Sequence, residues 1–188
     1  MRATYSARLN DGLVGRIEIA MNGHDFDLHA LYDALDARRL ERELSWAGVV
    51  REMSGSDAKK GSASTLTGLR ERRVAEGDGV LTMLRWLDRT PESFVPGTPD
   101  STADRFRLPA VPSRKILRWN ARALFQAADQ QRQEKQLTWT QVAREIGGFT
   151  PAMLTGLAKG GRVAIPPVMR LVRWLNRPAA SFTHLCDW

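Results

Sequence analysis

The sequence predicts an all-α protein built from two tandem helical domains. Three observations indicate this class: a long internal repeat, apolar residues at helical spacing within each copy, and capping and breaking residues where each helix should begin and end. A chain of 188 residues can bury one mid-sized core or two small ones, and the repeat favours two.

The repeat is visible by direct comparison of the two halves. Residues 31–46 (LYDALDARRLERELSW) return 93 positions later as 124–139 (LFQAADQQRQEKQLTW), and 85–94 (RWLDRTPESF) return 88 positions later as 173–182 (RWLNRPAASF). The fall in spacing gives the first copy about five extra residues, which we assign to the loop SGSDAKKG at 54–61. A period this long indicates a domain duplication, because solenoids need at least about three short repeats.

These comparisons set the expected boundaries. The two domains are placed at 24–94 and 114–188, and the four prolines of 95–113 mark a linker that need not fold. Residues 1–23 form an N-terminal arm or hairpin, because 13–21 alternate like a short β-strand and the preceding Asn-Asp-Gly favours a turn. An isolated hairpin is marginally stable, so pairing across a dimer and a disordered arm remain alternatives.

In the second copy, helical apolar spacing predicts a first helix from Leu117 to about Lys135. The second helix begins at Thr138, which with Gln141 forms a capping-box pattern, and stops at Gly147. These signals predict two helices joined by a short polar connection.

Thr150 followed by proline predicts the start of a short third helix, which ends at Gly160. A fourth helix opens at Pro166 and closes near Asn176. Its apolar stripe is predicted to be Val168, Leu171, Val172 and Leu175, with Val80, Met83, Leu84 and Leu87 in the first copy. Two short helices braced by longer ones are typical of a helix-turn-helix layout.

The second copy, LTWTQVAREIGGFTPAMLTGLAKGGRV…VMRLVRWL, resembles the lambda-repressor/Cro-like helix-turn-helix domains, also called the XRE family. The first copy, LSWAGVVREM…SASTLTGL, is similar to the same pattern but looser, because its inserted loop lies in the turn that is short in the family. The resemblance covers about three quarters of the chain and implies double-stranded DNA binding, with the third helix of each domain in the major groove.

The resemblance also implies the residues that face DNA. The groove-facing set is Thr150, Pro151, Ala152, Thr155 and Gly156 in the second copy, and Ser62, Ala63, Ser64, Thr67 and Gly68 in the first. These short side chains lack the bidentate donors that read bases, so we expect recognition mainly through phosphates and DNA shape. Trp46 and Trp139 hold the position where the family has a phosphate-binding glutamine, and an indole N–H can donate one such bond.

Basic side chains beside the helix pairs supply the expected phosphate contacts. They are Arg144, Lys159 and Arg162 in the second copy, and Arg51, Lys59, Lys60, Arg70, Arg72 and Arg73 in the first. The alternative for each is a solvated surface charge. Residues 114–188 hold twelve Lys and Arg against four Asp and Glu, whereas 24–94 hold eleven against thirteen, so the second copy is expected to supply most of the affinity.

Other functional classes receive no sequence support. The single cysteine excludes an intrachain disulfide, and the three histidines have no metal-ligand spacing, so we expect no metal and no cofactor. No set of nucleophile, base and orienting acid indicates an enzyme. The tryptophans Trp86, Trp119 and Trp174 are better placed for packing than for stacking on single-stranded nucleic acid. Without a membrane span or signal peptide, a cytoplasmic location is expected.

The sequence therefore favours a bacterial or phage transcriptional regulator, most simply a repressor, whose two domains act as an internal pseudo-dimer. The first domain could also mediate a homodimer or bind a protein partner. The alternative is a protein-interaction module, such as an antitoxin or adaptor, that retains the helix-turn-helix fold and uses its third-helix face on a protein partner. Small residues on that face suit close helix approach.

Overall fold

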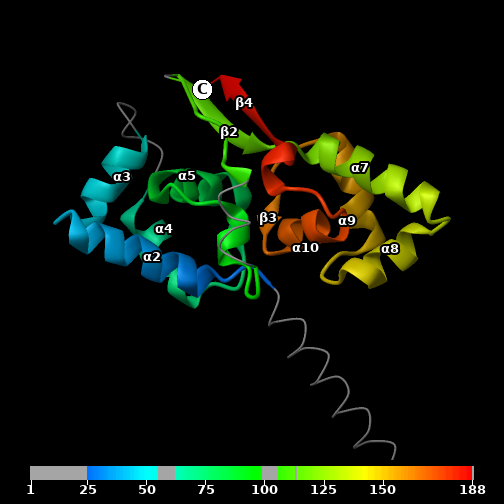
Figure 1. Cartoon of the computed structure of the whole chain (residues 1–188), viewed down its shortest axis with the longest axis horizontal. Coiled ribbons are helices and arrows are strands. Elements are labelled where there is room, and N and C mark those ends of the chain that lie inside the picture. Colours follow the sequence, from blue (N-terminus) through cyan, green and yellow to red (C-terminus); the bar gives the residue numbers. More distant parts are fainter. Residues whose placement is uncertain (1–24, 55–61, 99–105, 113, 188) are drawn as a thin grey trace, which may run out of the picture.

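The computed structural model describes residues 25–54, 62–98, 106–112 and 114–187. These residues form eight α-helices and two small antiparallel sheets, which confirms the helical class (Figure 1). The N-terminal arm or hairpin predicted for 1–23 lies outside the described residues, as does most of the inserted loop. No helix in the described ranges is long and apolar enough to cross a bilayer.

The first half of the molecule, residues 25–98, is a compact set of helices. Its α-helices are α2 (Leu28–Glu41), α3 (Trp46–Ser54), α4 (Ala63–Thr67) and α5 (Gly77–Leu87), with the 3-10 helices η1 (Gly68–Glu71) and η2 (Pro91–Phe94). Asp27 caps α2 by accepting from the N–H groups of His29 and Ala30. The four residues predicted for the apolar stripe of α5 are buried, as expected for a helix that faces the core.

The second half, residues 106–187, repeats this plan and adds a β-ribbon. Its elements are β2 (Lys115–Trp119), α7 (Ala121–Glu134), α8 (Trp139–Ile146), α9 (Pro151–Gly156), η4 (Leu157–Lys159), α10 (Pro167–Trp174), η5 (Ala179–Phe182) and β4 (Thr183–Asp187). The Thr138 capping box, the stop at Gly147 and the Thr150 cap are confirmed, and the predicted stripe of α10 is buried.

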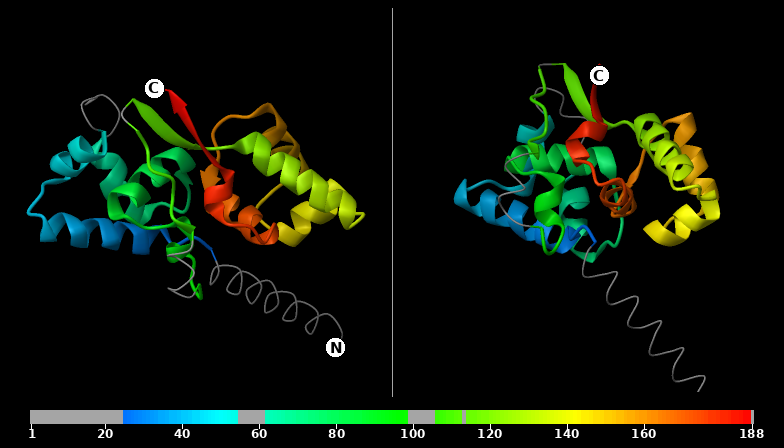
Figure 2. Two further views of the ribbon diagram at one scale, coloured as in Figure 1. Left: turned by 45° about the horizontal axis from the view of Figure 1, so that its top comes forward. Right: turned by 45° about the vertical axis from the view of Figure 1, so that its right-hand side comes forward.

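The predicted start of the first helix in the second half is wrong. Leu117 lies in β2, which pairs antiparallel with β4, and the helix begins only at Ala121. Asn120 fixes this start because its side chain accepts from the N–H of Ala123. Leu117 is buried on one face of the ribbon. Its apparent helical spacing with the apolar residues of α7 therefore combines a strand residue that faces the core with the helix that follows. The ribbon projects to one side in both views of Figure 2.

A short ladder joins the two halves at equivalent positions of the repeat. Strand β1 (Ala75–Glu76) pairs antiparallel with β3 (Ala164–Ile165), and Glu76 stands opposite Ala164, which is its own equivalent 88 positions later. An antiparallel pair of equivalent residues defines a local twofold axis. In Figure 1 a half-turn about the centre brings α2 onto α7, α3 onto α8 and α5 onto α10.

Further contacts hold the halves together around this ladder. Arg170 of α10 forms an ion pair with Asp25, and the carboxylate of Glu92 accepts from the N–H of Ala179 at 2.7 Å. Buried side chains of both halves form one continuous cluster. Leu108 and Val111 of the expected linker also pack against that cluster, so part of the linker is structured.

Candidate nucleic-acid interface

Each half presents a pair of short helices whose second member has an open outer face. In α9 only Leu154 is buried, and in α4 only Leu66 is buried. The helices α9 and α4 contact α8 and α3 respectively. Both helices are short and continue directly into 3-10 turns. The two surfaces correspond to the predicted third helices.

The predicted groove-facing residues of the second half gather on the open face of α9. Thr150, Pro151, Ala152 and Thr155 are exposed, and Gly156 is half-buried. The Thr150 hydroxyl accepts from the N–H of Met153 at 3.2 Å, and the Thr155 hydroxyl donates to the carbonyl of Pro151 at 3.1 Å. The face therefore offers methyl groups, the remaining oxygen lone pairs and the O–H of Thr150, which accepts from the backbone but does not donate to it.

The first half shows the same local bonding. Ser62, Ser64 and Thr67 are exposed, while Ala63 and Gly68 are half-buried. The Ser62 hydroxyl caps α4 by accepting from the N–H of Ser64, and Thr67 donates to the carbonyl of Ala63 at 3.2 Å. This face is therefore small and weakly polar, like its counterpart.

Met153 is a surface residue that sequence reasoning did not include. Its side chain is 47% exposed on α9, between the predicted groove residues, and it is one of few large apolar side chains exposed in the described residues. An exposed thioether on this face can contact a thymine methyl or an apolar partner.

Trp46 and Trp139 are held by side chains of their own domains. Trp139 stacks on Phe125 with ring centroids 5.5 Å apart, and the Arg132 guanidinium lies over the Trp139 ring, 5.1 Å from its centroid. Trp46 stacks on Tyr32 in the same way, with Arg39 at 5.0 Å. The repeat preserves both arrangements. These contacts give the indoles a packing role, and the predicted phosphate contact through their N–H groups stays a prediction.

The two remaining equivalent tryptophans also have protein partners. The Trp86 N–H donates to Glu52 at 2.9 Å, and the Trp174 N–H donates to Glu145 at 2.8 Å. The Trp86 bond is the largest cause that lowers the pKa of Glu52 below its ordinary value. A ring fixed at its edge in this manner is less free to stack on a base.

The predicted phosphate-binding residues fall into separate groups. Arg51 and Arg144 occupy equivalent exposed positions on α3 and α8, and Arg70, Arg72 and Arg73 are exposed just beyond α4. Lys59 and Lys60 lie outside the described residues. Lys159 and Arg162 are exposed at the end of α9, where they join a larger basic surface.

We call this surface the basic cleft. It is a hollow of about 550 Å³ in which Lys159 and Arg162 meet Arg118 of β2 and Arg122 of α7. Arg122 donates to the carbonyl of Lys159 at 3.5 Å, and so lies against the turn that follows α9. Sequence reasoning missed Arg118 and Arg122 because local patterns do not connect them with a turn about forty positions later.

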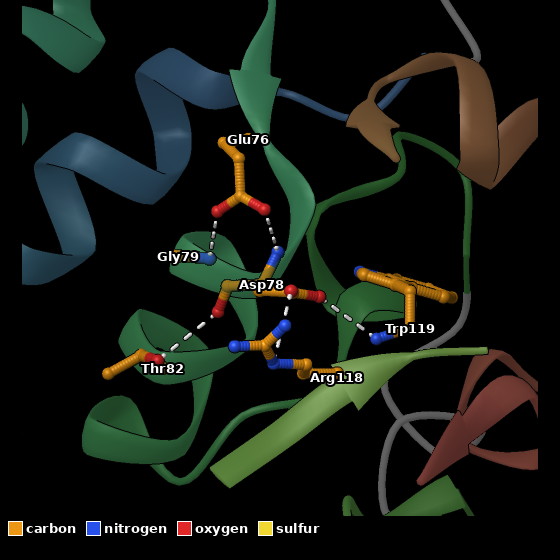
Figure 3. Close-up of polar contacts among 6 residues, drawn as sticks. All are labelled: Glu76, Asp78, Gly79, Thr82, Arg118 and Trp119. Atoms are coloured by element: carbon orange, nitrogen blue, oxygen red, sulfur yellow. Dashed lines mark hydrogen bonds and ion pairs between the residues drawn. The ribbon is translucent and has the colours of Figure 1, made fainter. Parts of the chain in front are cut away.

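Among the residues that the structure describes, the one carboxylate lining the basic cleft is that of Asp78, at the start of α5 (Figure 3). It accepts from the backbone N–H of Trp119 at 3.0 Å, and its second oxygen lies 3.8 Å from the Nε of Arg118. Burial raises the pKa of Asp78 above its ordinary value, although the Trp119 bond and nearby arginines oppose the shift. Asp78 thus ties the first half to the entrance of α7.

No family model, curated protein or solved structure matches this chain. Within the described ranges, no three His, Cys, Asp or Glu side chains converge as metal ligands. A proposal for the function is therefore based on the sequence and the structure of the chain itself.

Proposed function

We propose that the protein is a double-stranded DNA-binding transcriptional regulator with two helix-turn-helix units, and that the single chain acts as a pseudo-dimer. The observation that carries this proposal is the ladder between β1 and β3, in which repeat-equivalent residues pair across a local twofold axis. Twofold symmetry in a DNA-binding protein is matched by two half-sites on the duplex.

The placement of the third helices supports the proposal. In Figure 1 the same half-turn about the centre relates α4 to α9. The distance and orientation between α4 and α9 follow from direct packing between the halves, and so do not depend on the length of the linker. Such an arrangement favours one fixed spacing between half-sites.

Charge and side-chain chemistry support phosphate and shape readout. Arg144 is exposed on α8, and Lys159 and Arg162 are exposed just beyond α9, whereas α9 itself carries no arginine, lysine, asparagine or glutamine. Phosphate contacts give affinity with a strong salt dependence, and deformability of the duplex gives specificity without base-specific bonds. The second half is expected to supply most of the affinity.

The test uses Gly156, where the structure leaves room for a side chain. A Cβ at this position meets no atom within 4 Å, and the backbone is helical, so Gly156→Glu should fold normally. A carboxylate on this face opposes the phosphates and should weaken duplex binding by at least about tenfold. Fluorescence anisotropy measures the affinity, with a duplex taken from selection on a randomised pool.

Ala37→Glu is the matched control, because it adds the same charge to an exposed position of α2. The control should bind DNA nearly as well as the original chain. Equal losses in both variants would mean that net charge, and not the α9 face, governs binding. Absence of salt-dependent duplex binding in the unmodified protein would refute the proposed function.

A second candidate function is a protein-interaction module such as an antitoxin or adaptor. It is favoured by an apolar cleft of about 260 Å³ beside α9, lined by Phe149, Met153, Leu157, Val163 and Val168 among others. A cleft of this kind can receive an apolar side chain from a partner. Light scattering of purified complexes would show a stable protein assembly with no salt-sensitive DNA binding if this candidate were correct.

A further inference from the structure

The basic cleft gathers four cationic side chains from separate segments of the second half. Arg118 comes from β2, Arg122 from the first turn of α7, and Lys159 and Arg162 from the turn after α9. In the described part of the chain Arg122, Lys159 and Arg162 form no ion pair. Concentrated positive charge without acidic partners is costly in a protein unless an anion offsets it.

Arg118 is held at the wall of the cleft with an unused donor. Its Nε is buried and makes no hydrogen bond, since the nearest Asp78 oxygen is 3.8 Å away. Arg118 stands opposite His184 in the ribbon, and both line the cleft. Leu117, its neighbour, faces the core. The alternation of the strand therefore places the partly exposed Arg118 side chain on the opposite face of the ribbon from Leu117, toward the cleft.

The start of α7 adds backbone donors to the same wall. Asn120, Ala121 and Arg122 line the cleft. In the described structure the N–H of Asn120 donates to the carbonyl of Phe182 and the N–H of Ala123 to the Asn120 side chain, so the donors left at the helix start are the N–H groups of Ala121 and Arg122. The first N–H groups of a fourteen-residue helix carry partial positive charge and favour anions. Side-chain and backbone donors therefore converge on one hollow.

We propose that the basic cleft is a binding site for a small phosphorylated ligand with two linked phosphate groups. Four cations against one carboxylate match a polyanion, and a volume of about 550 Å³ lies in the range of about 300–1,000 Å³ typical of small-molecule sites. The arginines offer planar pairs of donors suited to phosphate oxygens.

A ligand in this site would regulate the proposed DNA binding. This regulatory role rests on the proposed function, whereas diphosphate binding itself does not. Lys159 and Arg162 belong both to the cleft and to the expected phosphate-contacting surface of α9. A bound diphosphate would engage them and draw Arg118 away from Asp78 of the first half. Ligand and duplex would then compete, and each would weaken the affinity of the other.

The first experiment titrates the full chain with inorganic pyrophosphate by calorimetry, without DNA and at constant ionic strength. The expected result is saturable binding at one site. Arg122→Gln removes one charge-assisted pair of donors and should weaken binding about tenfold, whereas Arg107→Gln, an exposed arginine outside the cleft, should leave it unchanged. Circular dichroism checks that each variant is folded.

A second experiment measures duplex binding with and without pyrophosphate. Orthophosphate, which has one phosphate group, is compared with pyrophosphate, which has two. Pyrophosphate should lower duplex affinity in the unmodified chain and in Arg107→Gln, but much less in Arg122→Gln. No saturable pyrophosphate binding, or equal binding by the two variants, would overturn the site. If the chain bound no DNA, the proposed function would fail, but calorimetry would still show whether the cleft binds pyrophosphate.

Discussion

At the scale of single residues, the junction between the halves depends on one position without a side chain. Gly77 is buried at the start of α5, against the Cδ1 and Nε1 edge of the Trp119 ring. Its N–H donates to the carbonyl of Val163 at 2.8 Å, which extends the ladder by one bond. Glycine is therefore required here for close approach, because the first half contacts both a ring and a backbone of the second.

Gly77→Ala should destabilise the protein for this reason. The added Cβ would lie 2.7 Å from the Trp119 ring and 2.9 Å from the Val163 carbonyl oxygen, which is backbone and cannot easily move. We expect the free energy of unfolding to fall by about 1–3 kcal/mol, measured by urea denaturation. Gly156→Ala is the control, and its open surroundings predict unchanged or slightly higher stability. Equal effects would contradict the close approach.

At the scale of elements, side-chain caps decide where the helices begin. Thr138 accepts from the N–H of Gln141, and the Gln141 side chain accepts in return from the N–H of Thr138 at 2.8 Å. Asn120 and Asp27 cap the equivalent helices α7 and α2. All of these caps supply acceptors for N–H groups of the first turn, which have no partner within the helix.

Removing the Thr138 cap tests how much this local device contributes. Thr138→Ala should lower the free energy of unfolding by about 1 kcal/mol, because it leaves donors of α8 without their partner. Thr140→Ala changes an exposed threonine in the same helix that takes no part in the cap, so its effect should stay within about 0.5 kcal/mol. Thermal or urea denaturation compares the two. A smaller loss for Thr138→Ala would contradict the capping box.

The same scale shows what the sequence could predict. The caps at Thr138 and Thr150 and the stop at Gly147 are local signals, and each was confirmed. The open surfaces of α4 and α9 follow from the same signals together with helical spacing. The strand at Leu117 was missed because its partner strand lies almost seventy residues later, and pairing across that distance leaves no local pattern.

At the scale of the whole molecule, the repeat gives the halves and tertiary contacts fix their relation. The ladder, the Asp25–Arg170 pair and the Asp78–Trp119 bond all join residues from different copies. None of these contacts follows from the periodicity of either copy, and the basic cleft depends on them too. The sequence therefore predicted the units and their third helices, but neither the junction nor the cleft.

The extent of the junction predicts one cooperative unfolding transition. Buried residues of both halves form a single cluster, so neither half should unfold alone, and calorimetric and van't Hoff enthalpies should agree. Arg170→Gln leaves Asp25 without its partner and should cost about 1–3 kcal/mol, lowering the midpoint by about 2–4 °C per kcal/mol. Differential scanning calorimetry measures both. Two separate transitions would show that the halves are independent.

The ladder at Glu76 and Ala164 has a consequence for how the protein responds to dilution. Two halves on one chain meet at an effective concentration fixed by covalent connection, so their pairing does not depend on the amount of protein present. A dimer of separate subunits dissociates when scarce and loses its second half. This chain therefore keeps its paired form even when only one molecule is present. Because each half has its own residues, a substitution in one half does not change the sequence of the other.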